Sequence, residues 1–181
     1  MVKILAVNGS PRKGNTDFML GLILESAKSA GAEVEEIKLK EKKINFCDGG
    51  DKHCLVKHSC CITDDMDEIY GKLEEVDLVI LASPSYFSNV TARMKNFMDR
   101  CNPYWFSKKL KRKKAFILGV GGGIDKSVKE TMEIFRTFLR ILEMEEVGSY
   151  YTKADKINEL EGNQKVIKEM ESIGEGLVSG N

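Results

Sequence analysis

The chain has 181 residues, of which 42% are hydrophobic and 31% are charged, a composition that is typical of a folded domain and excludes a disordered chain. Its 28 basic and 28 acidic residues balance, so we expect no nucleic-acid partner and no polybasic contact with a membrane surface. No hydrophobic run approaches the ~20 residues of a membrane helix, and the hydrophobic N-terminal stretch is too short for a secretion signal, so we expect a cytoplasmic protein with a single domain over residues 1–181.

Strands and helices alternate in the pattern of hydrophobic residues. Residues 2–8 predict a buried strand, after which Asn15 or Thr16 can cap a helix that Gly31 ends. The other predicted elements are, in chain order, strand 33–39, helix 63–75, strand 76–84, helix 88–101, strand 113–123, helix 125–142, strand 144–152 and helix 157–178. This alternation predicts an α/β fold, a doubly wound parallel sheet of five strands with helices on both faces.

Ligands of such sheets bind beyond the carboxyl ends of the strands, where three loops attract attention. The first loop, GSPRKGNT (9–16), joins a strand to a helix and can hold a phosphate with its backbone N–H groups, its hydroxyls and the helix N-terminus. It lacks the Gly-Lys-Ser/Thr ending of a nucleotide-binding P-loop and the GxGxxG spacing of a dinucleotide fold, so a phosphate monoester fits it better. The alternative is a plain turn between the strand and the helix.

The other two loops offer surfaces for a flat ring. The second, SPSYFSN (83–89), presents polar backbone and two aromatic side chains at the end of the most hydrophobic strand, or its aromatic residues merely cover the end of the sheet. The third loop contains three consecutive glycines, 121–123, which allow the backbone to approach a ligand closely or simply give flexibility.

Taken together, GSPRKGNT and the segment SPSYFSNVTARMKNFMDR (83–100) resemble the NADPH-dependent FMN reductase family, and within it the iron–sulfur flavoproteins. The resemblance spans roughly residues 2–150. It implies a flavodoxin-like fold, FMN as cofactor and a homodimer or homotetramer. Carried over by position, it places the FMN phosphate on Ser10, Arg12, Asn15 and Thr16. It places the ribityl chain and the ring along Pro84, Ser85, Tyr86, Phe87, Asn89, Gly121 and Gly122.

A polar segment at about 40–63 reads as a Cys-rich insertion loop, because it shows no clear period and contains Cys47, Cys54, Cys60 and Cys61. The iron–sulfur flavoproteins carry Cys-x2-Cys-x2-Cys and a fourth Cys before an Asp-Asp-Met helix start. Here Cys47, Cys60 and Asp64-Asp65-Met66 match, but Gly50 stands at the second position and Cys54 is one residue late.

Three hypotheses stay open for these cysteines. They are a [4Fe–4S] cluster with atypical ligands, a zinc or other metal site that also uses His53 or His58, and a site without metal whose thiols are free or form a redox disulfide. Cys101 lies on the hydrophobic side of a predicted helix and is expected in the core. The aromatic segment 102–106 predicts a lid on the core, a dimer contact or a cover over the flavin.

The function that we predict is an FMN-dependent oxidoreductase. Electrons pass from NAD(P)H as substrate, or from a reduced carrier such as ferredoxin, through FMN to an acceptor, and no side chain needs to act as an acid or base. Two alternatives are a non-enzymatic, flavodoxin-like electron carrier and a metal-binding scaffold without flavin.

Overall fold

The computed structural model describes residues 1–49, 51–123 and 125–180. Its centre is one five-stranded sheet in which all strands are parallel, in the order β2-β1-β3-β4-β5. The strands are β1 (Lys3–Asn8), β2 (Glu33–Lys38), β3 (Leu78–Pro84), β4 (Lys114–Gly121) and β5 (Glu145–Lys153). This order is that of a flavodoxin-like, doubly wound sheet, so the predicted fold class is confirmed.

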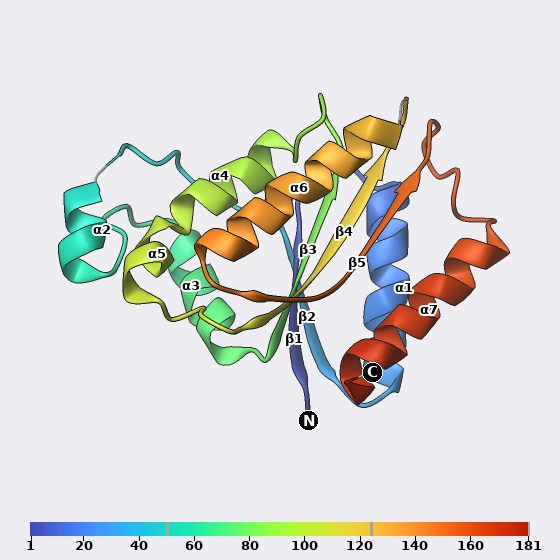
Figure 1. Cartoon of the computed structure of the whole chain (residues 1–181), viewed down its shortest axis with the longest axis horizontal. Coiled ribbons are helices and arrows are strands. Elements are labelled where there is room, and N and C mark those ends of the chain that lie inside the picture. The colour runs from blue at the N-terminus through green and yellow to red at the C-terminus, as the bar shows by residue number, and fades with distance from the viewer. Residues whose placement is uncertain (50, 124, 181) are drawn as a thin grey trace.

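Helices cover both faces of the sheet (Figure 1). One face carries α1 (Asn15–Ser29) and α7 (Gln164–Ser179), and the other carries α3 (Met66–Glu75), α4 (Ala92–Arg100) and α6 (Asp125–Ile141). Alternate residues of each central strand enter the two cores, because successive side chains of a strand point to opposite faces. In β3, for example, Val79 packs with α3, α4 and α6, whereas Ile80 packs with α1 and α7.

Several predicted helix boundaries were wrong. The first helix is preceded by Gly14 and has no side-chain cap, so neither Asn15 nor Thr16 caps it. Helix α4 begins only after Thr91, whose side-chain oxygen accepts a hydrogen bond from the Met94 N–H. The last helix begins at Gln164, because Asn163 accepts hydrogen bonds from the N–H groups of Lys165 and Val166.

Two short α-helices and the 3-10 helix η1 (Leu39–Glu41) were not predicted. The aromatic segment forms α5 (Asn102–Ser107), and the Cys-rich segment contains α2 (Asp51–Lys57), which packs against α5. Helix α2 has only seven residues, and its Leu55 and Val56 are exposed. Cys54 is the one described residue of α2 that is buried, and a single buried position makes no hydrophobic period, so the sequence pattern did not indicate the helix. In the part of the chain that the structure describes, no helix is both long and hydrophobic enough for a membrane span.

Candidate functional site at the carboxyl edge of the sheet

An open pocket lies at the carboxyl edge of the sheet, where the strands of Figure 1 end. All three loops singled out in the sequence contribute to it, and so does a fourth loop that follows β5. The predicted residues among its lining are Ser10, Arg12, Asn15, Thr16, Pro84, Ser85, Tyr86, Gly121 and Gly122. Phe87 and Asn89, also predicted, are not among the lining residues.

The first loop turns directly into helix α1. Ser10 and Thr16 are buried in its wall, and Arg12 is exposed at its rim. The Ser10 hydroxyl donates to the Arg12 carbonyl (2.7 Å), and the Ser10 N–H donates to the Asn8 side chain (2.9 Å), which fixes the turn. The first N–H groups of a helix have no partner inside the helix, so the start of α1 directs donors and a partial positive charge into the pocket.

The second loop ends in a tight turn. The Tyr86 N–H donates to the Asn89 carbonyl (2.8 Å), and the Asn89 N–H donates to the Tyr86 carbonyl (3.1 Å). Between them, Phe87 and Ser88 both have positive φ angles, 51° and 59°, as in a type I′ turn. The Phe87 ring therefore lies fully in solvent (105% exposed) and is not part of the pocket lining. Asn89 pairs with Tyr86 through its backbone and its side chain binds its own neighbour, Val90 (2.8 Å).

Helix α6 holds the Ser85 side chain in place through a hydrogen bond. The Thr131 hydroxyl donates to the Ser85 Oγ (2.8 Å), and the Ser85 N–H donates to the Val120 carbonyl (2.7 Å). A methyl group at Gly121 would lie 2.7 Å from the Ser85 Cβ. The second and third loops therefore touch at backbone distance, which explains the glycine at this position.

The fourth loop, residues 154–157, was missed in the sequence. Asp155 accepts a hydrogen bond from the Gly123 N–H (2.6 Å), and this bond lowers the pKa of the Asp155 carboxyl. Asn15 donates to the Lys156 carbonyl (2.8 Å) and accepts from the Leu160 N–H (3.2 Å), so it joins the first loop to the fourth. The signal was available, because the loop follows a predicted strand of the same sheet and ends at the same edge.

The pocket fits a flavin mononucleotide on two observations. One end carries the start of α1 and the Arg12 side chain, which suit a phosphate dianion. The other end is bounded by Pro84, Tyr86 and the glycine backbone of β4, which leave room for a flat ring.

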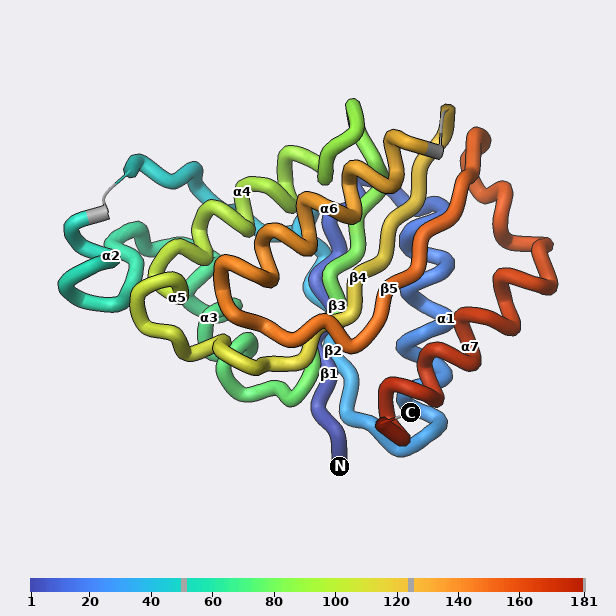
Figure 2. Tube along the Cα trace, viewed as in Figure 1, coloured from blue at the N-terminus to red at the C-terminus, as the bar shows by residue number. Residues whose placement is uncertain are grey.

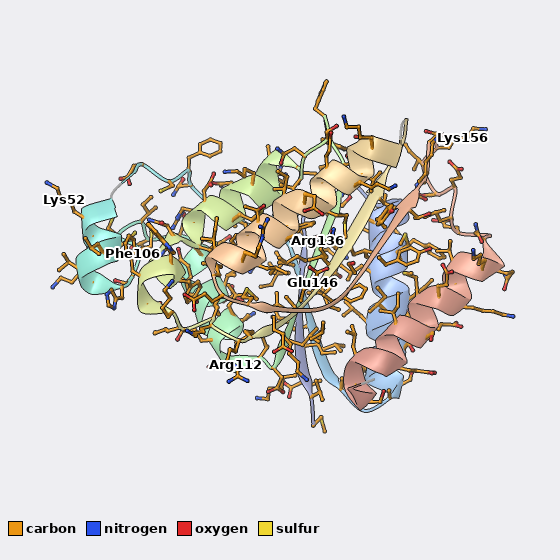
Figure 3. All side chains as sticks on the ribbon, in the orientation of Figure 1. Lys52, Phe106, Arg112, Arg136, Glu146 and Lys156 are labelled. Atoms are coloured by element: carbon orange, nitrogen blue, oxygen red, sulfur yellow. The ribbon has the colours of Figure 1, made fainter. Side chains whose placement is uncertain are left out.

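The cysteine segment lies far from this pocket. In Figure 3, Lys156 beside the pocket and Lys52 on α2 are at opposite ends of the molecule, and the trace in Figure 2 shows the segment as a separate lobe against α5. None of the residues 102–106 lines this pocket, so the aromatic segment does not cover it within one chain. Tyr104 is buried in the core as a lid would be, whereas Trp105 is half exposed.

The four cysteines are free thiols in different surroundings. Cys54 is buried, Cys60 is half-buried, and Cys47 and Cys61 are exposed, whereas Cys101 lies in the core as predicted. Burial raises the pKa of the Cys54 thiol, although a hydrogen bond with Asn102 lowers it. Repulsion from Cys60, Cys47 and Cys61 raises the pKa further. The Cys54 thiol thus lies within electrostatic reach of the other three. Over the described ranges, however, no three His, Cys, Asp or Glu side chains are arranged as a ligand group for a metal ion.

Comparisons with known proteins agree with the pocket. The family model described as NADPH-dependent FMN reductase matches residues 2–159. An iron-sulfur flavoprotein of Archaeoglobus fulgidus is 45% identical over 126 residues, which are 69% of this chain and 57% of that protein. An iron-sulfur flavoprotein of Methanocaldococcus jannaschii is 35% identical over 148 residues, 81% of this chain and 76% of that protein. The chain therefore spans little more than half the length of the first of these relatives.

A solved structure titled flavone reductase shares the fold. It superposes with a TM-score of 0.79 at 21% identity, over 99% of this chain and 62% of that one. At this identity the likeness concerns the fold alone.

Proposed function

This chain belongs to the NADPH-dependent FMN reductase family, and from that membership we propose that it is an oxidoreductase that works through bound FMN. The observation that carries the proposal is the pocket, in which four loops at one sheet edge place a helix N-terminus and a cationic side chain at one end and glycine backbone at the other. Bound FMN would supply the exchange of electrons in steps of one or two.

The chain's own residues bind and orient that group. The N–H groups at the start of α1, the Ser10 and Thr16 hydroxyls and the Arg12 guanidinium would hold the phosphate. The Asn15 amide bonds to Lys156 of the fourth loop and to Leu160 just after it, so we assign Asn15 the role of keeping the first and fourth loops together. Ser85 and Gly121 would give the ring an edge of fixed backbone, because α6 holds Ser85 in place.

We propose NAD(P)H or a reduced carrier such as ferredoxin as the electron donor, and a small molecule or such a carrier as the acceptor. The pocket supports a donor that stacks on the ring from outside, since Tyr86 lines the pocket and is 40% exposed. We also propose a homodimer or homotetramer. An open groove of about 730 Å³ between α4, α5 and α6 exposes Trp105 and Ile141, and such surfaces are typical of interfaces.

For the cysteines we propose an iron–sulfur cluster as a route for single electrons. The supporting facts are the names of the relatives, the four thiols on one segment and the electrostatic effect of three of them on Cys54. The donor chemistry fits a thiolate centre. Closing four ligands around it requires rearrangement of the segment, because the thiols differ in burial and the spacing departs from the family motif.

The test of the main proposal is a comparison of two flavins. We expect the chain to bind FMN at least about tenfold more tightly than riboflavin, because hydrogen bonds to a charged phosphate contribute roughly 1.5–3 kcal/mol each. Arg12→Ala should lower the ratio of FMN affinity to riboflavin affinity. Lys13→Ala is the matched control and should leave this ratio unchanged, since Lys13 does not line the pocket. Equal affinities for both flavins would contradict the phosphate site. Bound FMN without oxidation of NADH or NADPH would favour the electron-carrier alternative.

A further inference from the structure

Asn8 is an amide buried at the end of an otherwise hydrophobic strand. It is the last residue of β1 and is 1% exposed, and residues 4–7 before it are all buried and hydrophobic. Parallel strands with helices on both faces are hydrophobic along their length, and asparagine is disfavoured in strands. The strand itself therefore gives no reason for an amide at this position.

Two carboxylates fix the orientation of this amide. Its Nδ2 group donates to Asp17 Oδ1 in the first turn of α1 (2.6 Å) and to Glu36 Oε1 on β2 (2.9 Å). Ionised carboxylates only accept hydrogen bonds, so an amide turned by 180° would place its own oxygen against two negative groups. The Asn8 side-chain oxygen is therefore directed away from both carboxylates.

That oxygen accepts a hydrogen bond from the Ser10 N–H (2.9 Å) and so sets the first turn of the loop after β1. Gly9, which lies between the two residues, is fixed by other elements. Its N–H donates to the Ala82 carbonyl (2.8 Å), and its carbonyl accepts from the Thr91 hydroxyl (2.7 Å). Ser10 lines the pocket and Asn8 does not, so Asn8 acts on the pocket through Ser10.

Stability alone does not account for this cluster. The Oδ2 atom of Asp17 is buried and has no hydrogen-bond partner among the residues that the structure describes. A buried acceptor without a partner costs free energy. Asp17 and Glu36 also lie beside a loop that we propose binds a phosphate dianion, which their charges repel. What the two carboxylates provide is a fixed acceptor for the Ser10 N–H, so that the loop holds its shape before a ligand binds.

We propose that Asn8 is a positioning residue of the phosphate site, held in one orientation by Asp17 and Glu36. By fixing Ser10 it preforms the turn that leads into the start of α1, so little order has to be created when the phosphate of FMN binds. This inference rests on the proposed function, because it assigns the FMN phosphate to the first loop. It concerns the phosphate and not the flavin ring.

The experiment compares the affinities of the full chain for FMN and for riboflavin, which lacks the phosphate. Asn8→Leu keeps the size and the net charge of the side chain but removes its acceptor and its donors. Asn8→Asp keeps an acceptor but replaces the donors with an oxygen that faces two carboxylates. Ser26→Ala is the matched control, because it removes another hydrogen bond of α1, to the Glu171 carbonyl (2.7 Å), away from the pocket.

Flavin fluorescence measures both affinities, and urea unfolding measures the stability of each flavin-free protein. In Asn8→Leu we expect the ratio of FMN affinity to riboflavin affinity to fall about twofold to tenfold, the effect of one neutral hydrogen bond. The ratio should also fall in Asn8→Asp, and it should do so even in about 1 M salt, where the added charge is largely screened. Riboflavin affinity should stay near the wild-type value in both variants, and Ser26→Ala should leave the ratio unchanged.

A folded Asn8→Leu variant with the wild-type ratio overturns the proposal. So does an equal loss of affinity for both flavins together with lower stability, which would make Asn8 a merely structural residue. If Asn8→Leu does not fold, Asn8→Asp decides by the same two criteria. Failure of the phosphate site itself shows in the wild type, which would then bind FMN no more tightly than riboflavin, and this inference would fall with it.

Discussion

The side-chain amide of Asn15 and the backbone carbonyl of Lys156 are joined by a 2.8 Å hydrogen bond, although 141 positions separate them in the chain. The other end of the same amide accepts from the Leu160 N–H at 3.2 Å. One nearly buried side chain therefore connects the start of α1 with the loop after β5, across two walls of the pocket proposed for FMN.

Replacement of Asn15 by Ala should loosen the pocket. It leaves a carbonyl and an N–H group without partners, and an unsatisfied buried group costs about 1–3 kcal/mol. We expect the flavin-free protein to lose about that much unfolding free energy in urea, and FMN affinity to fall as well. A variant within about 0.5 kcal/mol of the wild type would show that the bridge contributes nothing.

Much of this site was predictable because its chemistry is local. The loops after the first, third and fourth strands carry turn residues and glycines where the strand pattern stops, and nine predicted residues line the pocket. Phe87 and Asn89 do not line it, because the positive φ angles of the 86–89 turn depend on backbone pairing that no residue type announces.

The contacts of Arg100 with Asp64 and Asn45 could not be predicted from the sequence, for another reason. They join α4 to positions 36 and 55 residues away, and Arg100 stands among the hydrophobic residues of α4, where an arginine is usually solvent-exposed. Helix α2 was missed because it buries no periodic face. Local patterns indicate strands, caps and turns, whereas a long-range polar contact becomes visible only when the fold brings its two sides together.

Gly121→Ala should separate the second and third loops. The added methyl would lie 2.7 Å from the Ser85 Cβ and 2.9 Å from Val128 Cγ2, and overpacking of this kind costs about 1–3 kcal/mol. We expect lower stability and weaker FMN binding, measured by urea unfolding and flavin fluorescence. Gly21→Ala is the matched control, because nothing lies within 4 Å of the added atom and helix α1 should gain about 1 kcal/mol. Equal effects of the two changes would refute the tight contact.

Phe87→Gly should separate folding from flavin binding. Phe87 is 105% exposed, so its ring contributes no packing in the flavin-free protein. Phe87 has a positive φ angle of 51°, which glycine adopts without strain, and this should stabilise the fold by roughly 1–2 kcal/mol. The gain offsets the larger backbone entropy that glycine loses on folding. We expect an unfolding temperature within a few degrees of the wild type. FMN or NAD(P)H should bind more weakly if the ring covers the flavin, and unchanged binding of both would exclude Phe87 from the site.

Asp64→Asn should change how stability depends on pH. Burial works against the charge of Asp64, but the hydrogen bonds from Arg100, Met66 and Asn45 lower its pKa below the ordinary value. A carboxyl whose pKa is lowered on folding stabilises the fold at pH values above its unfolded pKa, about 3.9, and this contribution is lost as the pH falls through the folded pKa. At pH 7 the variant should be about 3–5 kcal/mol less stable, since it leaves Arg100 buried without its counter-charge.

The gap between Asp64→Asn and the wild type should therefore shrink as the pH falls below about 4. Urea unfolding at pH 7, 5 and 3 measures it. A gap of the same size at pH 7 and pH 3 would mean that the carboxylate charge is not what stabilises this part of the fold.

Trp105→Glu should disrupt assembly if the groove between α5 and α6 is the subunit interface. Trp105 is 51% exposed and lines this groove with Ile141, Met98 and Phe138, so burial of the indole against a second copy would remove a large apolar surface from water. A carboxylate there would lack a partner, and we expect a shift from dimer or tetramer to monomer by sedimentation at micromolar concentration. Val147→Glu, on edge strand β5, is the control, because Val147 is exposed but does not line the groove. If Trp105→Glu assembles like the wild type while Val147→Glu dissociates, the interface lies at the sheet edge and the groove remains free for another ligand.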